Sequence, residues 1–525
     1  MSGAQDRAPA AVDFASGGEL ENYLRVLQIS GKTAWYPWSL RSFSGRELQK
    51  LLPSDTASLP WRLSSAKLTS RVAVGSVDVR TVLNSAFPYG SNDGAVWAGR
   101  GLTTSASASV TARVGPVSLT LAPLAFIATN AAFPLLDNGQ TGSLSYNDGL
   151  FADRVDHPQR FGDGPHGRGD PGASEIRLDT RFVTAGFGTA PMSWGPASSF
   201  PFLLGTNAAG FPHAFLGTGE PVNIWLGKTH VRAMWGKLSQ SSYSPVTGSD
   251  NYLSDAEPGR DRLMTGIVLI FTPRPIPHLE VGVARFAHVA NRVDGITSDF
   301  IKSVWPTFLK KNVYRDPDVE TGNELASFFA RWAFPTAGFE LFAEHGHDDW
   351  YHDLRDLTQE PDHNRSYSIG FQKTFDRSAR RLDVLRGELI NYQMPPLGRD
   401  RPGQGFIYSH NFLRQGHTQR GQLLGSSAGV GSASASLLAW DRYAPSGRTT
   451  LSWRRTVRGH IGTFYLDGST NDKSIDVIHS LGAERSRGNA KLRYTLGVDL
   501  MANLNRHFTS DVFNFNARAG MEWSP

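Results

Sequence analysis

The sequence predicts an all-β protein, an antiparallel barrel that crosses a membrane, with a small helical segment before it. Apolar and polar residues alternate strictly over eleven positions, 513 to 523, which indicates a strand whose one face contacts lipid. The expected strands run to about ten residues, whereas strands of soluble proteins have about five or six and membrane-barrel strands about 9 to 11. The polar segments between them alternate short and long, as turns and loops at opposite ends of a barrel do.

The last two expected strands show the alternation most clearly. One face of the final segment carries Phe513, Phe515, Ala517, Ala519, Met521 and Trp523, and the other carries Asn514, Asn516, Arg518, Gly520 and Glu522. The preceding segment places Leu492, Tyr494, Leu496, Val498 and Leu500 opposite Arg493, Thr495, Gly497 and Asp499. We expect the apolar faces to contact lipid and the polar or small faces to line the lumen.

Further strand candidates are Val72 to Leu83, Leu263 to Phe271, Leu279 to Phe286, Phe339 to Glu344, Tyr367 to Phe375 and Leu451 to Val457. At roughly 25 residues per strand and connection, the chain beyond the helical segment leaves room for roughly 16 to 18 strands. No linker divides residues 69–525, so we expect one domain there. A large soluble β-sandwich or propeller is the alternative, although no repeat of blade length supports a propeller.

Residues 1–68 are expected to form a separate helical region. Leu20, Tyr23, Leu24 and Leu27 have the spacing of one apolar helix face, and Gly31 should end that helix. A second helix should begin at Ser44, an N-cap with Glu47 three residues on, and end at Pro53. The pattern therefore predicts two short helices.

Composition excludes several classes of protein. The chain has 525 residues and no cysteine, so disulfides and cysteine-ligated metal centres are impossible. Its most apolar run, Leu263 to Phe271, is far shorter than the roughly 20 residues of a spanning helix. Basic residues form no patch and are interleaved with acidic ones, so nucleic acid is not an expected partner. The start MSGAQDRAPAAV lacks the apolar core of a secretory signal, so no export signal is present in the given chain.

Several stretches in order resemble the capsule-assembly Wzi family of outer-membrane proteins. They are Trp194-Gly195-Pro196 followed by Leu203, Leu204, Asn207, Ala208 and Pro212, then residues 266–285 (GIVLIFTPRPIPHLEVGVAR), 320–334 (ETGNELASFFARWAF) and 414–431 (RQGHTQRGQLLGSSAGVG). The paired helices at the beginning are also similar. The resemblance covers essentially the whole chain.

The resemblance implies an 18-stranded barrel of the bacterial outer membrane, closed at its periplasmic end by a plug of residues 1–68. It also implies a surface lectin that binds capsular polysaccharide and helps attach the capsule. The chain departs from the usual pattern at its end, Trp523-Ser524-Pro525, because outer-membrane barrels usually finish on an aromatic residue. We expect a monomer surrounded by lipid and lipopolysaccharide, because a closed barrel leaves no free strand edge.

The densest cluster of reactive side chains follows the strand that ends near Glu344. It contains His345, His347, Asp348, Asp349, Trp350, Tyr351, His352, Asp353 and Arg355. Trp350 or Tyr351 can stack on a pyranose ring while acidic and basic side chains hydrogen-bond its hydroxyls. We therefore name Asp348, Asp349, Trp350, Tyr351, His352 and Arg355 as the candidate polysaccharide-binding residues. A divalent metal site or an ordinary solvated loop are the alternatives, and no defined ligand spacing supports a metal.

Other motifs indicate no catalytic or cofactor site. Ser30-Gly31-Lys32-Thr33 lacks the first glycine of a phosphate-binding loop and ends a helix instead of opening one. Arg168-Gly169-Asp170 is too short to indicate adhesion, and residues 151–173 should form an exposed loop. Residues 425–429 (GSSAG) match a nucleophile elbow, but the small residues that follow favour a strand where a helix is needed.

Three functions remain open from the sequence. The first is a non-enzymatic, lectin-like protein without cofactors. The second is a channel or porin for small solutes, for which polar lumenal faces are equally suitable. The third is a hydrolase that uses Ser427.

Overall fold

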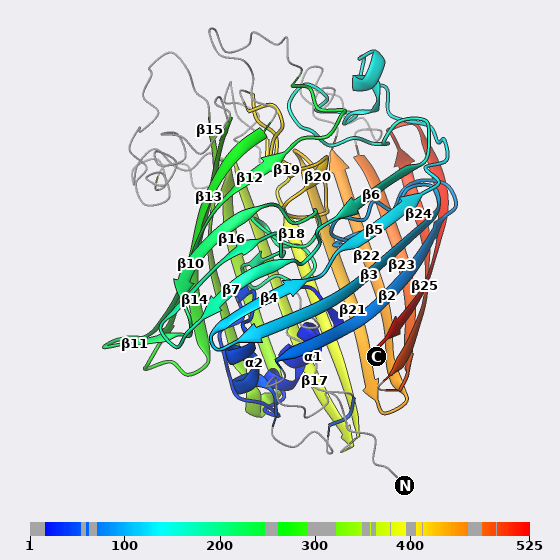
Figure 1. Ribbon diagram of the computed structural model, residues 1–525. Coiled ribbons are helices and arrows are strands. Elements are labelled where there is room, and N and C mark those ends of the chain that lie inside the picture. Colours follow the sequence, from blue (N-terminus) through cyan, green and yellow to red (C-terminus); the bar gives the residue numbers. More distant parts are fainter. Residues whose placement is uncertain are drawn as a thin grey trace.

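The computed structural model describes residues 16–53, 59–61, 71–246, 261–290, 322–348, 358, 364–378, 380–394, 406–411, 413–459, 475–489 and 491–524. They form a closed antiparallel barrel with two helices inside it (Figure 1). The barrel segments are β2 (Val72–Asn84), β3 (Gly101–Val114), β4 (Val117–Leu121), β5 (Leu124–Ala128), β6 (His166–Asp170), β7 (Glu175–Asp179), β8 (Val183–Gly188), β10 (His213–Thr218), β11 (Val222–Ile224), β12 (Gly227–Ser239), β13 (Asp261–Pro273), β14 (Leu279–Ala290), β15 (Gly322–Phe334), β16 (Phe339–Asp348), β17 (Arg365–Ser378), β18 (Arg381–Asn391), β21 (Ala433–Ala444), β22 (Gly447–Gly459), β23 (Ile475–Gly488), β24 (Leu492–Arg506) and β25 (Ser510–Trp523).

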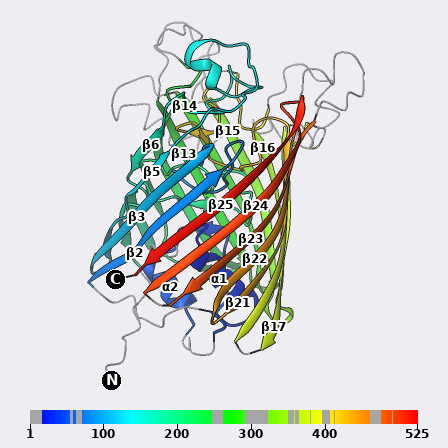
Figure 2. The ribbon, with the colours of Figure 1, turned by 90° about the vertical axis from the view of Figure 1, so that its right-hand side faces the viewer.

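These segments make 18 strands, because three pairs of segments are pieces of single strands. β4 and β5 both pair with β3 and are two pieces of one strand. β7 pairs with β4 and β6 pairs with β5, so β6 and β7 are two pieces of the next strand. β10 and β11 both pair with β12 and are pieces of a third strand. The last strand closes the barrel on the first, with Trp523 opposite Val77 and Asn516 opposite Asn84 (Figure 2). The expected membrane barrel is confirmed, and all eight of the expected strands lie within observed ones.

Connections between the strands differ sharply at the two ends of the barrel. The end at which β25 finishes has the short turns 115–116, 180–182, 225–226, 274–278, 335–338, 379–380, 445–446 and 489–491. The other end has the connections 85–100, 129–165, 189–212, 240–260, 291–321, 349–364, 392–432, 460–474 and 507–509. We call these the inner end and the outer end. Two short 3-10 helices, η2 (Gly142–Tyr146) and η4 (Pro335–Ala337), lie in these connections.

Apolar side chains on the outer surface of the strands form the face that contacts lipid. On β25, Phe513 is 74% exposed and Met521 42%, whereas the alternating Asn514 and Asn516 are 3% and 1% exposed. Exposed aromatic residues gather at the inner end: Phe182, Trp225, Trp332, Tyr494 and Trp523. Such a ring of aromatic residues is typical of a membrane interface. No helix in the described part of the chain is long and apolar enough to cross a membrane.

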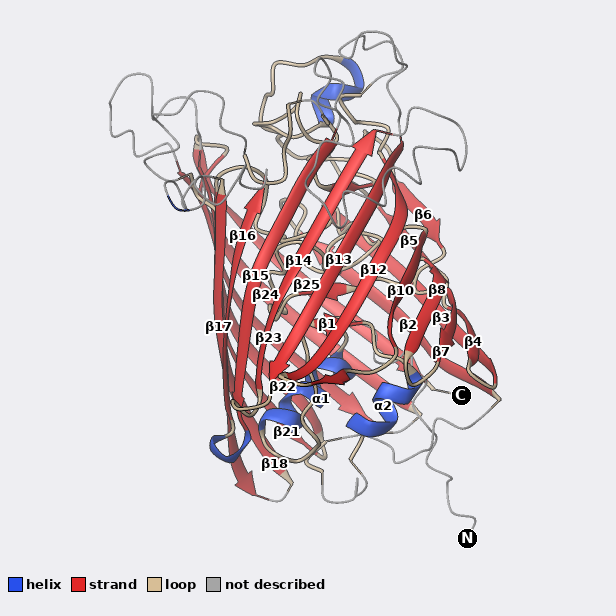
Figure 3. Cartoon of the chain, turned by 90° about the vertical axis from the view of Figure 1, so that its left-hand side faces the viewer, coloured by secondary structure: helices blue, strands red, loops and turns tan. Residues whose placement is uncertain are grey.

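The N-terminal helices lie inside the barrel near its inner end (Figure 3). Helix α1 (Glu19–Ile29) ends before Gly31, which has a φ of +69°. Helix α2 (Gly45–Leu51) begins at Ser44, whose side chain and that of Glu47 form the expected capping box. Both expected helices are confirmed. Between and beside them, strand β1 (Leu40–Arg41) pairs with β9 (Ser193–Trp194), which links the helical segment to a loop from the outer end.

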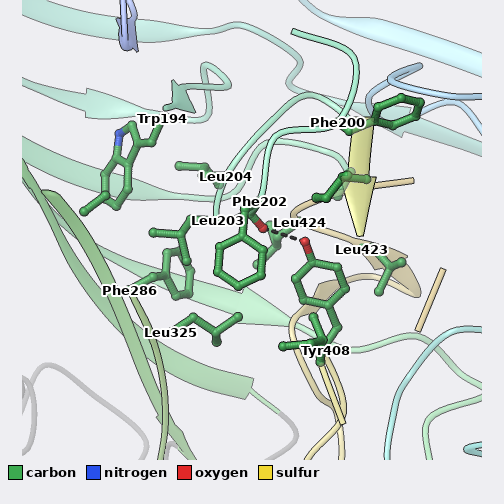
Figure 4. Packing of buried hydrophobic residues seen from close by; sticks show 14 of the residues in the cluster. Trp194, Phe200, Phe202, Leu203, Leu204, Phe286, Leu325, Tyr408, Leu423 and Leu424 are labelled. Atoms are coloured by element: carbon green, nitrogen blue, oxygen red, sulfur yellow. Dashed lines mark hydrogen bonds between the residues drawn. The ribbon is translucent and has the colours of Figure 1, made fainter. Parts of the chain in front are cut away.

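A hydrophobic core fills the middle of the barrel (Figure 4). Residues 192–211, 406–411 and 413–430 turn inward, and their side chains pack on the lumenal faces of β12 to β15 and β21. The small sheet of β19 (Thr418–Gln419) and β20 (Gln422–Leu423) belongs to the last of these segments. The lumenal faces of β12 to β15 are therefore apolar, with Val268, Ile270 and Phe286 fully buried. Our expectation of polar lumenal faces is wrong for this wall, because these faces pack against a hydrophobic core and do not line a water-filled lumen.

The expectation of an exposed loop at residues 151–173 is also wrong. Val155 and Asp156 are fully buried, and residues 166–170 form strand β6 of the barrel wall. Asp156 accepts hydrogen bonds from the backbone N–H and the hydroxyl group of Ser241. Turn-forming residues in this segment thus serve to fold it back into the barrel.

Candidate functional site

Buried ion pairs join helix α1 to the barrel wall. Arg25 donates a 2.8 Å hydrogen bond from Nε to Glu340 on β16, and both side chains are fully buried. Arg331 on β15 lies 2.6 Å from the other oxygen of Glu340 and 3.3 Å from Glu280 on β14. Glu280 in turn accepts the backbone N–H of Trp38 at 2.8 Å. Because such charges are costly to separate inside a protein, this network fixes the helical segment to β14, β15 and β16.

A second set of contacts holds helix α2. Glu47 accepts hydrogen bonds from the Tyr36 hydroxyl at 2.6 Å and from the Ser44 backbone N–H at 2.7 Å. Burial opposes ionisation of Glu47, but the contacts of His230 on β12, the charge of Arg177 and the Ser44 N–H outweigh it and lower the pKa to about 2. Glu47 is therefore a carboxylate at neutral pH and belongs to the anchorage of the helix.

The core segments form a further layer between the helices and the outer end. Tyr408 donates a 2.6 Å hydrogen bond to the carbonyl oxygen of Phe202 and accepts one from the Ser426 N–H at 3.0 Å (Figure 4). Nε2 of His417 lies 2.6 Å from the carbonyl oxygen of Leu203. The two inward segments are thus bonded to each other, and together with the helices they occupy much of the lumen.

In the described part of the barrel, an inner and an outer cavity lie beside this core, along the wall formed by β2, β3 and β21 to β25. The inner cavity has a volume of about 700 Å³ and reaches from Glu19 on helix α1 to residues 89–95. The outer cavity has a volume of about 230 Å³ and reaches from residues 87–93 to Arg506 and His507 at the outer end. Tyr89, Gly90, Ser91 and Asp93 line both, so this short segment lies between the two cavities. Its Ser91 is held by Ser427, 2.9 Å away, and by Arg454 at 2.8 Å.

Charges in the inner cavity largely neutralise one another. Arg493 lies 2.5 Å from Glu19 and 3.2 Å from Glu522. Arg448 lies 3.0 Å from the other oxygen of Glu19, and Arg518 is ion-paired with Asp499. Most charged side chains of this lining are therefore paired within the protein.

The outer cavity combines aromatic rings with arginines. The guanidinium group of Arg506 lies 4.2 Å from the ring centroid of Phe87, a cation–π distance. Arg458, Tyr89 and Asp476 also line it. Burial, together with the charges of Arg506 and Arg458, lowers the pKa of His507 to about 3, so this imidazole is neutral at physiological pH. Such a lining can stack on a sugar ring and hydrogen-bond its polar groups.

Among the candidate residues named from the sequence, the structure describes only Asp348. It lies at the end of β16, is 3% exposed and accepts the backbone N–H of Tyr408 at 2.8 Å. Asp349, Trp350, Tyr351, His352 and Arg355 lie outside the described residues, as does Asp353 of the same cluster. The strand also continues past its expected end, so His345 and His347 belong to the barrel wall. Within the described ranges, no group of three or more potential ligand side chains could hold a metal ion.

The other motifs have structural roles. Ser427 lies in the segment between β20 and β21, without the helix of a nucleophile elbow. Ser30 and Gly31 end helix α1, as the sequence indicates. In the Arg-Gly-Asp run, Asp170 is 5% exposed and lies 3.0 Å from Arg420, so it belongs to the wall of the barrel.

Sequence reasoning missed the outer cavity entirely. Its lining comes from seven separate places in the chain, residues 87–98, 133–136, 148–159, 421–430, 458, 476–478 and 506–508, together with Asn207. No motif in the sequence marks them as parts of one binding site, and only the closure of β2 on β25 brings the first and last together. A single signal was available: Arg458 and Arg506 both stand at outer ends of strands, where a lumenal ligand would enter.

Comparison with known proteins gives the family. The family model for capsule assembly protein Wzi matches residues 176–520. The chain belongs to the Wzi family. A solved structure of Wzi from Escherichia coli, described as an outer membrane protein involved in group 1 capsule assembly and as a carbohydrate-binding β-barrel, has 13% identity and a TM-score of 0.61. The match covers 96% of this chain and 98% of that one, so the two share a fold.

Two further solved barrels give lower scores. OprD from Pseudomonas aeruginosa has 9% identity and a TM-score of 0.39, and covers 86% of this chain and 94% of its own. OccAB3 from Acinetobacter baumannii has 8% identity and a TM-score of 0.41, with 86% and 98% covered. No curated protein matches the chain. As a Wzi-family barrel with a lipid-facing outer surface, the chain is a multi-pass protein of the bacterial outer membrane, with the inner end in the periplasm and the outer end at the cell surface.

Proposed function

We propose that the protein is a surface lectin that binds capsular or other surface polysaccharide at its outer end and helps to assemble or attach the capsule. The observation that carries the proposal is the outer cavity, an aromatic and arginine-lined hollow at the cell-surface end of a Wzi-family barrel. The solved Wzi barrel of the same family is described as carbohydrate-binding. We propose that the protein acts by binding alone, without catalysis and without a cofactor.

The division of the lumen supports binding over transport. The helical segment, which we propose acts as a plug formed by residues 1–68, is fixed at the inner end by the Arg25, Arg331, Glu340 and Glu280 network. The bonded core segments lie above it, and residues 89–93 lie between the two cavities. A channel for small solutes would need all three to move. The second candidate function is a porin. Its solutes would have to pass along the wall formed by β21 to β25, where the two cavities lie end to end.

The candidate residues named from the sequence extend the proposed surface. We propose that Asp349, Trp350, Tyr351, His352 and Arg355, in the connection after β16, contact the polymer outside the barrel. Asp348 would position this connection through its hydrogen bond to Tyr408. We further propose a monomer within lipid and lipopolysaccharide, with no nucleic-acid partner.

Binding of purified protein to surface polysaccharide tests the proposal. The protein in detergent is titrated with capsular polysaccharide isolated from the cells in which it occurs, and binding is followed by isothermal titration calorimetry. Saturable binding supports a lectin. Absence of binding to that polymer, and to lipopolysaccharide from the same cells, would remove the proposal.

A further inference from the structure

The outer cavity contains two arginines without an ion-pair partner. Among the described residues, neither Arg458 nor Arg506 lies within 4.0 Å of a carboxylate, whereas Arg448, Arg493 and Arg518 of the inner cavity are all paired with carboxylates. We infer that the outer cavity receives an anionic sugar unit of the polysaccharide and binds its charged group between Arg458 and Arg506. This inference rests on the proposed function and names the chemical class of its ligand.

The position of each arginine supports a binding role. The guanidinium carbon of Arg506, at the end of β24, lies 4.2 Å from the ring centroid of Phe87, and this contact holds the guanidinium in place without neutralising it. Arg458 on β22 packs against Gly429, where an added Cβ would lie 3.1 Å from its Nε. Gly429 also has a φ of +132°, so a side chain at this position would be strained and would press on the guanidinium. Both guanidinium groups are thus in contact with residues that carry no charge.

Other charges around the cavity are already satisfied within the protein. Asp148 lies 3.1 Å from Nδ1 of His157, and Asp93 accepts the backbone N–H of Ser91 at 2.9 Å and lies 3.9 Å from Arg80. Asp476, the carboxylate next to the two arginines, is 7% exposed and accepts the His507 backbone N–H at 3.1 Å. Two arginines therefore face one carboxylate, and this end of the cavity has one positive charge in excess.

The remaining lining suits a sugar ring better than a free ion. Tyr89 and Phe133 contribute aromatic rings to the lining. The side-chain amides of Gln159, Asn207 and Gln422 are hydrogen-bonded to backbone groups and so fix the shape of the cavity. The volume of about 230 Å³ is smaller than the roughly 300–1,000 Å³ of pockets for drug-sized ligands, so it fits one or two sugar units of a longer chain. Arginine forks bind carboxylates and phosphates in the same planar geometry, so the charged group is a uronate-type carboxylate or a sugar phosphate.

Charge variants of the full-length protein test the inference. Arg458→Gln and Arg506→Gln each remove a cation and keep much of the side-chain volume. Arg487→Gln is the matched control, because Arg487 is an exposed arginine at the inner end of β23. Asp476→Asn removes the competing carboxylate and keeps an acceptor for His507. The probe is the capsular polysaccharide from the same cells, used as isolated and after chemical reduction of its carboxylates to alcohols. Affinity is measured by calorimetry, and a heat-dependent shift in gel mobility confirms that each variant is folded.

We expect Arg458→Gln and Arg506→Gln each to weaken binding about 10-fold to 100-fold, Asp476→Asn to strengthen it, and Arg487→Gln to leave it unchanged. Loss of binding after carboxylate reduction identifies a carboxylate, and retained binding that still depends on both arginines identifies a phosphate. If the wild type binds the polymer and both arginine variants bind it equally well, the inference is overturned while the lectin proposal stands. If the wild type does not bind the polymer at all, the lectin proposal fails, and the inference fails with it.

Discussion

Arg25 of helix α1 and Glu340 of β16 form an ion pair at 2.8 Å in which both side chains are completely buried. Residues 315 positions apart in the chain are thereby joined inside the lumen. Arg25 also donates to the carbonyl oxygen of Pro196 at 2.8 Å and to Ser198 at 2.9 Å. One side chain therefore connects the helical segment, the inward segment at residues 192–211 and the barrel wall.

Replacing this arginine tests whether the helical segment is a structural part of the barrel. Arg25→Met should lower the free energy of unfolding by about 2–4 kcal/mol, because it leaves Glu340 paired with Arg331 alone, removes the donor to Pro196 and removes one of the two arginine donors to Ser198. Urea titration in detergent measures the change. Lys32→Ala is the control. The side chain of its partner Asp376 is 53% exposed, so this substitution should lower the free energy of unfolding by at most about 1 kcal/mol. Equal effects of the two substitutions would contradict a buried anchor.

Conductance in planar bilayers tests how the lumen is closed. The full-length protein should not conduct. Deletion of residues 1–68 should open the inner cavity but give little conductance, because Phe202, Tyr408 and residues 89–93 still occupy the middle of the lumen. Deletion of residues 1–15 alone, which keeps both helices, is the control. A large steady conductance of the full-length protein would favour the porin.

The hydrogen bonds of Tyr408 test the core. Tyr408→Phe removes the donor to Phe202 and the acceptor of the Ser426 N–H. Because both buried backbone groups then lack a partner, the free energy of unfolding should fall by about 1–3 kcal/mol. Tyr494→Phe makes the same chemical change on the lipid-facing surface, where Tyr494 is 51% exposed, and should cost much less. Both variants lose one hydroxyl group, but only Tyr408→Phe loses buried hydrogen bonds. A larger fall of the unfolding midpoint in Tyr408→Phe than in Tyr494→Phe is therefore due to those hydrogen bonds.

Acid should weaken the core through His417. Burial and the charge of Arg262 lower the pKa of His417 to about 4, against the opposing hydrogen bond to Leu203. The unfolded chain binds a proton there below about pH 6.5, so between about pH 6.5 and 4 unfolding takes up a proton and stability falls as the pH falls. His417→Gln keeps a donor for Leu203 but does not titrate. Between pH 7 and 4.5, the free energy of unfolding should therefore fall by about 2–3 kcal/mol less in the His417→Gln variant than in the wild type. Parallel pH profiles of the two proteins would exclude this role.

The strands and helices could be predicted from the sequence because their causes are local. Alternation along residues 513 to 523 fixes which side of β25 faces lipid, and Ser44 with Glu47 fixes the start of helix α2. These signals need no knowledge of distant contacts.

Features that depend on distant contacts could not be predicted. The turn-forming composition of residues 151–173 is the same whether the segment points outward or folds back, and only the contact of Asp156 with Ser241 decides it. The apolar lumenal face of β13 likewise depends on the inward segments that cover it. Arg458 and Arg506 lie 48 positions apart without a motif, so only the closed barrel brings them to one cavity.

The central claim is that a closed barrel binds polysaccharide at its cell-surface end. It is tested most directly by titrating the folded wild-type protein with capsular polysaccharide from the same cells and repeating the titration with a variant in which Arg458 and Arg506 are both glutamine. We predict saturable binding by the wild type and a loss of affinity of at least 100-fold in the double variant. A folded wild-type protein that binds no polymer would contradict the claim.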